Sequence, residues 1–576
     1  MQRSTSIFLS TDTMDRLCKS FAAAMALGVL ALPARAAAAD VDAKLTEAAT
    51  AIDQALSHSS VPGLVIGITD RHGLRKVIVH GYGDLKTRKP LTAESRFAIG
   101  SISKAFTAIA LMQVSQESRF DPHAPITRYL PSLVIHSRFA PITGHDLLSH
   151  TSGLPNYLPD SASSRYAAIE LGTFAPAYAP GAHWWYSNTG FQLLGYVLEN
   201  IEHEPYTKIL RHRVLEPIGM TSTSPIIDDA ERDRMVVSYV RWPYDGSYVE
   251  APWFEYSAGD GSLVANVADM SAYVRFILNR GMGDKGRVLS ESTFATLTTP
   301  VLEDYAYGLW VRKEDGHTVI GHTGSIGGFH AAVEAHMDEG FGLVFLCNAA
   351  IDQELKKWVV KVATAAYAGA ALPQPPAPNA QSTQPDLHEY AGQFRLAGSG
   401  APGTDAATLQ FVSGQDRLVL ETEHGSIALE RMGTDLFRAA GDAVGFYPFV
   451  FGRSGTEGKG KVTNVSQGAL WYTAAGFPES LQPTMPKEYA SYVGHFVNNG
   501  PEGPVARVFV RNGRLMMLLS EDEEATAEPL APLGPGQFRI GKADYSPERA
   551  RFDTIVAGQA LRLFISGVPL YRKDIP

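Results

Sequence analysis

A proline-rich segment divides this chain of 576 residues into two parts of different character. Residues 371–386 (ALPQPPAPNAQSTQPD) are rich in Pro, Gln and Ser, a composition typical of a semi-rigid linker. Before this segment, strand-like runs stand at both ends of a region with mostly helical patterns. After it, the pattern is β and shows no long helix. The chain is therefore expected to fold as an α/β part followed by an all-β part.

The first part, residues 41–370, predicts one α/β domain whose terminal strands meet in a single sheet. Residues 41–58 and the run SKAFTAIALMQVSQ (103–116) have helical spacing, and a last helix is expected near Asp352–Tyr367. The predicted strands are, early in the chain, Gly63–Thr69 and Lys76–His80, and, late in the chain, Tyr305–Val311, Thr318–Ile320, Gly328–His336 and Gly342–Cys347.

The second part repeats itself weakly. Residues 389–394 (EYAGQF) resemble residues 491–496 (SYVGHF), so that Tyr390 and Tyr492 stand 102 residues apart, and residues 406–421 echo residues 505–521. Each copy alternates polar and apolar residues between turns. Two small antiparallel barrels or sandwiches are predicted, over residues 387–484 and 485–576, although any two β-meanders share some of this likeness.

The N-terminus has the pattern of a secretory signal peptide. Basic residues precede the apolar run Phe21–Leu32, and small residues follow it, so residues 1–36 are expected to be removed and the protein to be periplasmic or secreted. The true start is either Met1 or Met14. The run is too short to span a bilayer comfortably, and no integral membrane segment is expected in the mature chain.

Composition excludes several classes of protein. The net charge of −10 and the pI near 6.0 give no basic surface for nucleic acid. The two cysteines, Cys18 and Cys347, cannot provide a disulfide framework. No G-x-S-x-G elbow is present, and His203-Glu204 lacks the second histidine of H-E-x-x-H because residue 207 is Thr. We expect neither a metal nor a cofactor.

The central motif is Ser101-Ile102-Ser103-Lys104. On a helix, residues i and i+3 share a face, so Ser101 and Lys104 are expected to be within hydrogen-bonding reach. Serine needs a base to become a nucleophile, and a lysine whose pKa is lowered by burial supplies one. The alternative is an N-capping serine beside a solvated lysine.

Two further motifs follow the first along the chain. Tyr186-Ser187-Asn188 offers a phenol for proton transfer and an amide for binding a substrate amide. The run His322–Ser325 (HTGS) offers groups for a substrate carboxylate, and its Gly324 would let a substrate backbone approach closely. Taken alone, each motif is better explained structurally: the first as a loop tyrosine with a turn asparagine, and the second as a turn with a satisfied histidine.

As a set, the motifs S-x-x-K, Y-x-N and H-T-G in this order resemble those of the penicillin-recognising serine hydrolases, in the branch of class C β-lactamases and D-Ala-D-Ala carboxypeptidases. The runs 146–155 (DLLSHTSGLP) and 307–310 (YGLW) resemble further segments of that branch. The resemblance covers roughly residues 45–368 and implies an α/β (α+β) domain with an antiparallel sheet flanked by helices. It also implies catalysis through an acyl-enzyme. His150, in the first of these runs, is expected to be structural.

The resemblance also implies roles for the matching residues. Ser101 would be the acylated nucleophile, Lys104 its base and Tyr186 the proton donor to the leaving group. Asn188 would bind the substrate amide, and the N–H groups of Ser101 and Ser325 would form the oxyanion hole. The remaining residues expected to bind substrate are His322, Thr323 and Gly324.

Several substrates remain open. A histidine at position 322, where class C β-lactamases carry lysine, and the two β-barrels resemble D-aminopeptidases and DD-carboxypeptidases, so a peptidase acting on small peptides is the leading interpretation. An esterase or amidase follows, then a true β-lactamase. A protein of a different class, a non-hydrolytic penicillin-binding sensor or binding protein, is a further alternative. Partners would be a small peptide, amide or ester, and a homodimer is left open.

Overall fold

The structure, a computed structural model, describes only part of the chain: residues 41–156, 165, 168–169, 171–241, 247–375, 386–396, 408–414, 417–433, 435–439, 449–454, 460–467, 470–474, 476, 487–498, 505–511, 514–519, 527–566 and 568–573. The expected signal peptide, Cys18 and most of the expected linker lie outside these residues. The first residues after the last helix of the first domain pack back onto it, because the indole Nε1 of Trp358 donates to the carbonyl oxygen of Pro373 at 3.2 Å.

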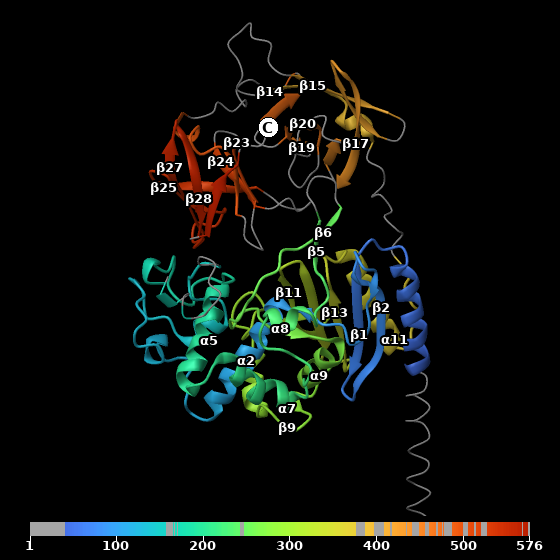
Figure 1. Cartoon of the computed structure of the whole chain (residues 1–576), viewed down its shortest axis with the longest axis vertical. Helices are drawn as coiled ribbons and strands as arrows, with labels where there is room; N and C mark the ends of the chain where they lie inside the picture. Colours follow the sequence, from blue (N-terminus) through green and yellow to red (C-terminus); the bar gives the residue numbers. More distant parts are fainter. Residues whose placement is uncertain are drawn as a thin grey trace, which may run out of the picture.

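The first domain is built on an antiparallel sheet of seven strands (Figure 1). Strand β13 pairs with β1, so the two ends of the domain meet in one sheet, as the sequence predicts. In spatial order the strands are β10 (Trp310–Glu314), β11 (His317–Ile326), β12 (Phe329–His336), β13 (Phe341–Cys347), β1 (Gly63–Asp70), β2 (Gly73–Asp84) and β3 (Lys89–Pro90).

Each face of this sheet is covered by helices because its strands alternate their side chains between two apolar cores. In β1, Leu64, Ile66 and Ile68 face a core formed with helix 41–56 and α11 (Gln353–Tyr367). Val65 faces the larger core on the other side. That core includes residues of α2 (Ser103–Gln116), α5 (Asn188–Glu202) and α9 (Val267–Leu278).

Shorter elements complete the domain. The helical ones are η1 (Gly100–Ile102), η2 (Ile126–Arg128), α3 (Gly144–Leu148), η3 (Leu171–Thr173), α6 (Tyr206–Leu210), the π-helical turn Arg211–Leu215, α7 (Glu216–Ile218), α8 (Asp229–Arg232) and α10 (Glu291–Leu297). Three two-stranded sheets pair β4 (Phe97–Ala98) with β7 (Val264–Ala265), β5 (Tyr239–Arg241) with β6 (Tyr248–Glu250), and β8 (Met282–Gly283) with β9 (Gly286–Arg287).

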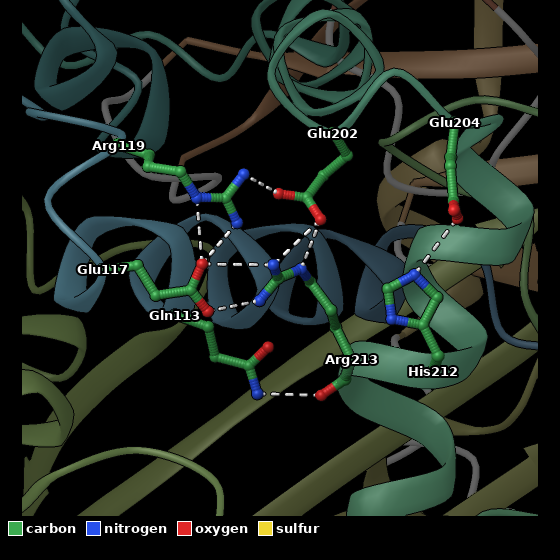
Figure 2. Close-up of polar contacts among 7 residues, drawn as sticks. All are labelled: Gln113, Glu117, Arg119, Glu202, Glu204, His212 and Arg213. Carbon is green, nitrogen blue, oxygen red and sulfur yellow. Dashed lines mark hydrogen bonds and ion pairs between the residues drawn. The ribbon is translucent and has the colours of Figure 1, made fainter.

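A cluster of ion pairs joins the C-terminal ends of α2 and α5 (Figure 2). Arg213, in the π-helical turn, donates to Glu117 just beyond α2 at 2.8 Å and to Glu202 at the end of α5 at 2.9 Å. Arg119 pairs with the same two carboxylates. These contacts hold the far ends of the two helices whose N-terminal ends carry the S-x-x-K and Y-x-N motifs.

The all-β part forms two closed barrels of eight consecutive strands, drawn in orange and red in Figure 1, rather than sandwiches. The first barrel contains β14 (Gly392–Leu396), β15 (Thr408–Ser413), β16 (Leu418–Thr422), β17 (Gly425–Gly433), β18 (Leu436–Ala439), β19 (Phe449–Arg453), β20 (Val462–Gln467) and β21 (Leu470–Ala474). The second contains β22 (Gly494–Val497), β23 (Val505–Arg511), β24 (Arg514–Leu519), β25 (Glu528–Gly534), β26 (Gln537–Ile540), β27 (Arg549–Val556), β28 (Gln559–Ile565) and β29 (Val568–Arg572).

The sequence repeat has the same structure in both barrels. A short helix, η5 (Leu387–Tyr390) or η9 (Lys487–Tyr489), precedes the first strand. Gly392 and Gly494 both have positive φ, 147° and 153°, at the start of that strand. The following Phe394 and Phe496 are buried in their barrel cores. The repeated Y-x-G-x-F string therefore marks the entry of each barrel, where the chain turns into the core.

One strand prediction was partly wrong. Strand β10 begins at Trp310, whereas Tyr305–Leu309 forms a tight turn in which Ala306 N–H donates to Leu309 at 2.8 Å. Gly308 has a φ of 71°, and a Cβ there would lie 3.0 Å from the backbone of Lys104. The turn replaces a strand here because the chain must pass close against α2. Over the described residues, no helix is both long and apolar enough to cross a membrane.

Candidate active site

Ser101 and Lys104 lie where the chain leaves β4 and enters α2. Ser101 is in the 3-10 turn η1, and Lys104 is in the first turn of α2. The ammonium Nζ of Lys104 donates to the hydroxyl Oγ of Ser101 at 3.0 Å. The proximity expected from the i, i+3 spacing is therefore present, and Lys104 is fully buried rather than solvated.

Three acceptors surround the amine of Lys104. Besides Ser101, it donates to the side-chain oxygen of Asn188 and to the backbone carbonyl oxygen of Asp260, the latter at 2.9 Å. Burial lowers the pKa of Lys104 from 10.5 to about 8, and the negative charge of Asp260 opposes that lowering. At pH 7 about one tenth of this amine is therefore unprotonated and able to accept a proton, and this fraction rises through pH 8.

Asp260 is a residue that the sequence reasoning missed. It is buried, and its carboxylate accepts from the phenol of Tyr256 at 2.8 Å. Burial raises the pKa of Asp260, while the charge of Lys104 lowers it. No motif marks this position, because its contact with Lys104 joins residues 156 positions apart.

Tyr186 lies just before α5, whose first turn is capped by the Ser187 hydroxyl accepting from the N–H of Gly190 at 3.2 Å. The amine of Lys104 lies 4.9 Å from the centre of the Tyr186 ring. Burial raises the pKa of Tyr186, and a side-chain hydrogen bond with Ser101 opposes this rise. At neutral pH the phenol therefore keeps its proton and lies within hydrogen-bonding reach of Ser101.

Asn188 is the first residue of α5, and both polar atoms of its side-chain amide already make hydrogen bonds within the protein. Its Oδ1 accepts from Lys104, and its Nδ2 donates to Oδ1 of Asn156 at 3.0 Å. Asn156 also accepts from the backbone N–H of Asn188 at 3.3 Å. Asn156 is a second residue missed from the sequence, and it orients the Asn188 amide with its oxygen toward the lysine.

Strand β11 passes very close to the turn that carries Ser101. A Cβ on Gly324 would lie 1.9 Å from the carbonyl oxygen of Ile99 and 3.1 Å from the amide nitrogen of Ser101. A Cβ on Gly100 would lie 2.8 Å from the amide nitrogen of Ser325. Only glycine permits this approach, which brings the backbone N–H groups of Ser101 and Ser325 into one region.

The H-T-G-S motif alternates along β11. Thr323 and Ser325 are exposed, whereas His322 and Gly324 are buried. Thr323 and Ser325 can therefore reach a bound molecule at the edge of the site. His322 differs from the expectation, because its ring lies on the inner side of the strand.

His322 belongs to a buried chain of hydrogen bonds. Its Nδ1 contacts the carbonyl oxygen of Thr323, which can only accept, so Nδ1 carries the proton. Its Nε2 then accepts from the phenol of Tyr305 at 3.1 Å. In turn, Nε2 of His150 lies 3.2 Å from that phenol, and Nδ1 of His150 accepts from the N–H of Ser187 at 3.1 Å. Nε2 of His150 therefore carries the proton of that ring and donates to the Tyr305 hydroxyl. The donor and the acceptor of each hydrogen bond in this series are thus defined.

Both histidines are neutral. Burial and the nearby charge of Lys104 together lower the pKa of His322 to about 3. Burial and the charges of Lys104 and His322 hold the pKa of His150 well below 6.5. His150 therefore ties the Tyr186–Asn188 turn to β11, the structural role that its sequence context indicates, and Tyr305 is the link that the sequence did not reveal.

Other reactive groups are few in the part of the chain that the structure describes. There, no group of three or more His, Cys, Asp or Glu side chains is placed to hold a metal ion. Cys347 is a buried free thiol in β13, and burial raises its pKa.

Comparison with known proteins identifies the family of the first domain. The family model described as beta-lactamase matches residues 48–367, more than half of the chain. The chain belongs to the beta-lactamase family. The match includes all seven strands of the sheet, which lie between Gly63 and Cys347, and the residues of the S-x-x-K, Y-x-N and H-T-G motifs.

Two curated proteins are similar to this chain in sequence. Protein flp of Staphylococcus aureus is 26% identical over 315 residues, which are 52% of this chain and 62% of that protein. This beta-lactamase family member thus matches less than two thirds of that relative. Penicillin-binding protein 4* of Bacillus subtilis is 24% identical over 380 residues, covering 61% of this chain and 81% of that protein.

A solved structure shares the fold. The octameric penicillin-binding protein homologue from Pyrococcus abyssi aligns with 83% of this chain and 98% of its own, with a TM-score of 0.52 and 19% identity. At that identity the likeness concerns the fold alone. It extends beyond the residues matched by the family model into the all-β part of this family member.

Proposed function

We propose that this protein is a serine hydrolase that cleaves amide bonds of small peptides through an acyl-enzyme. The observation that carries the proposal is the 3.0 Å hydrogen bond between Ser101 Oγ and a fully buried Lys104 whose pKa is lowered to about 8. A buried amine that can lose its proton near neutral pH, in contact with a serine hydroxyl, is the arrangement that nucleophilic catalysis requires.

The environments of Lys104 and Tyr186 support their roles as the base and the acid of the proposed reaction. Lys104, with its lowered pKa, accepts the proton of Ser101 as Oγ bonds to the substrate carbonyl carbon. The oxyanion that forms lies near the backbone N–H groups of Ser101 and Ser325. Tyr186, which stays protonated because burial raises its pKa, donates its proton to the leaving nitrogen as the C–N bond breaks.

Deacylation reverses these proton movements. The Tyr186 phenolate takes a proton from water, and the resulting hydroxide attacks the acyl carbon. The bond between this carbon and Ser101 Oγ then breaks, and Lys104 returns its proton to Oγ. One water is consumed, the carboxylic acid product leaves, and all three side chains recover their starting states.

The position of His322 favours a peptidase over a β-lactamase. Because its ring is buried, neutral and hydrogen-bonded at both nitrogens, it supplies no cation for the carboxylate of a penicillin. Thr323 and Ser325 instead offer exposed hydroxyl groups to the substrate. We therefore assign His322 and Asn188, whose side-chain polar atoms are already hydrogen-bonded within the protein, to positioning, and Thr323 and Ser325 to substrate contact.

The test is release of p-nitroaniline from D-Ala-p-nitroanilide by purified protein, with Ser101→Ala as the control. Multiple turnovers that the substitution abolishes would support a D-aminopeptidase-like activity. Turnover of p-nitrophenyl esters alone would indicate an esterase, and turnover of a penicillin a β-lactamase. A single acylation per chain without release would contradict the hydrolase proposal and indicate a sensor.

We further propose that the protein is exported. The support is the basic, apolar and small-residue pattern of residues 1–36. Expression of the whole chain in a bacterial host, followed by cell fractionation and N-terminal sequencing, tests this. A mature N-terminus near residue 37 outside the cytoplasm is expected, and an uncleaved cytoplasmic chain would contradict it.

A further inference from the structure

A loop of the second barrel contacts the wall of the candidate active site. This loop, residues 541–548, connects β26 with β27. The ring of its Tyr545 stacks on that of His183, with centres 3.8 Å apart and planes 3° from parallel. Trp185 meets the same tyrosine edge-on at 6.3 Å. The second barrel is thus seated against the segment that leads directly into the Tyr186 motif.

Glu548 makes the polar part of this contact. One oxygen of its carboxylate accepts from the backbone N–H of Asn156 at 2.8 Å and from the indole N–H of Trp185 at 2.9 Å. The other accepts from the hydroxyl of Ser566 within the barrel. Arg549 braces the loop by donating to the carbonyl oxygens of Ser546 and Glu548. The carboxylate is therefore held by its own barrel and presented to the first domain.

Asn156, which binds Glu548, is connected to Ser101 by further hydrogen bonds. Asn156 is fixed by Glu548 through its N–H, and its carbonyl oxygen accepts from the N–H of Thr189 at 3.2 Å. Its side-chain oxygen orients the amide of Asn188, which accepts from Lys104, which in turn donates to Ser101. An unbroken series of hydrogen bonds thus runs from the second barrel to the serine.

We propose that Glu548 is a positioning residue of the active site, which acts through Asn156 and Asn188 on Lys104. The second barrel is then a component of the catalytic unit rather than an appended module. This inference rests on the proposed serine mechanism. It assigns to the barrel a role that the catalytic motifs alone do not indicate.

The expected consequence concerns both rate and pH. Without Glu548, Asn156 loses its anchor and the Asn188 oxygen is no longer held against Lys104. The ammonium form then loses an acceptor, so the pKa of Lys104 falls. The other titratable groups that face this amine are Asp260, Tyr186, His150 and His322, and none of them contacts Glu548 through a hydrogen bond that the described residues show.

The test measures acylation of the full-length protein by p-nitrophenyl acetate between pH 5.5 and 9.5. We expect Glu548→Ala to slow the p-nitrophenol burst about tenfold at the plateau of the pH–rate profile, with a smaller change in KM. The rising limb of that profile should move to lower pH. Glu548→Gln keeps an acceptor oxygen and should restore most of the rate and the original limb. Asn156→Ala combined with Glu548→Ala should cost little more than either change alone.

A matched control is Asp553→Asn in β27 of the same barrel. Its carboxylate pairs with Arg551 and Arg562 and makes no described contact with the first domain. This variant should retain the wild-type rate and pH limb. Thermal melting of each variant identifies any that fold poorly, in which case Asn156→Ala alone tests the same relay from the catalytic side.

Three outcomes would overturn the proposal. One is a folded Glu548→Ala variant with the wild-type burst and pH limb. Another is a slowed burst with an unmoved limb that Gln does not rescue, which would indicate general loosening of the interface. The third is a wild type that shows no Ser101-dependent release of either p-nitrophenol from the ester or p-nitroaniline from the anilide, which would refute the proposed function and this inference together. The first two leave the proposed function intact.

Discussion

The charge of Asp260 should set the pH at which the enzyme becomes active. If Lys104 is the base, only its neutral form accepts the proton of Ser101, so kcat/KM rises with pH through the pKa of Lys104. That pKa is about 8, and the carboxylate of Asp260 is the group that raises it against burial. The substitution Asp260→Asn removes this charge and keeps an oxygen for the hydrogen bond from Tyr256.

The magnitude follows from the titration. With a pKa of about 8, about one tenth of Lys104 is neutral at pH 7, so wild-type kcat/KM should rise about tenfold between pH 7 and its plateau. Loss of a neighbouring opposite charge typically moves a pKa by about one unit or more. In Asp260→Asn the midpoint should therefore fall to about 7, and the rate at pH 7 should increase about fivefold with little change in the plateau.

The assay is kcat/KM for p-nitrophenyl acetate from pH 5.5 to 9.5, corrected with Ser101→Ala. Asp269→Asn is the matched control, because Asp269 is also buried and bonded to hydroxyl and backbone donors but does not act on Lys104. A wild-type midpoint near 10.5, or an Asp260→Asn midpoint that stays in place or rises, would refute the assignment of Lys104 as the base.

Three further substitutions test the remaining parts of the site. Tyr186→Phe removes the acid, so the rate of anilide hydrolysis should fall about 10²–10⁴-fold. Acylation by a nitrophenyl ester should fall far less, because its leaving group needs no proton, and equal losses in the two assays would argue against the acid role. Gly324→Ala places a Cβ 1.9 Å from the Ile99 carbonyl, so kcat/KM should drop about 100-fold or more as β11 moves from Ser101, and a near-wild-type rate would contradict the oxyanion site. Tyr305→Phe leaves Nε2 of both His150 and His322 unpaired, so urea denaturation should show a loss of about 1–3 kcal/mol in unfolding free energy, and an unchanged value would exclude the hydrogen-bond chain.

Much of the fold could be predicted from local sequence. The continuous apolar runs Gly63–Thr69 and Gly342–Cys347 identified two strands that pair as β1 and β13, because a strand buried on both faces is apolar throughout. The helix of residues 103–116 was placed correctly. These predictions succeeded because periodicity is a property of a few consecutive residues.

The candidate site could be predicted only where it is local. The i, i+3 spacing was sufficient to bring Ser101 and Lys104 together, and their contact is seen. Asp260 and Asn156 were missed because each reaches Lys104 or Asn188 through a distant part of the chain. A single sequence carries no periodic signal for such a contact.

The orientation of the His322 side chain could not be predicted from the sequence for a different reason. The motif was recognised, but which of its side chains face outward depends on the register of β11 in the sheet. Because His322 stands opposite Val333 and lies on the buried side, it contacts Tyr305 rather than the edge of the site. One residue of register would have reversed this arrangement, and the sequence does not fix the register at that precision.

The neutrality of His322 and the reactivity of Lys104 depend on each other. The charge of Lys104 helps to lower the pKa of both His150 and His322, and by reciprocity a charge on either histidine would lower the pKa of Lys104 further. As the imidazoles are neutral, Asp260 is the one described charge that acts on the lysine, and it holds the pKa at about 8 instead of lower. A permanent cation on this face of β11 would therefore need a compensating acid elsewhere to keep the same base. The buried histidine chain positions the Tyr186 turn without adding such a charge, which is why a hydrogen-bonded imidazole suits this site.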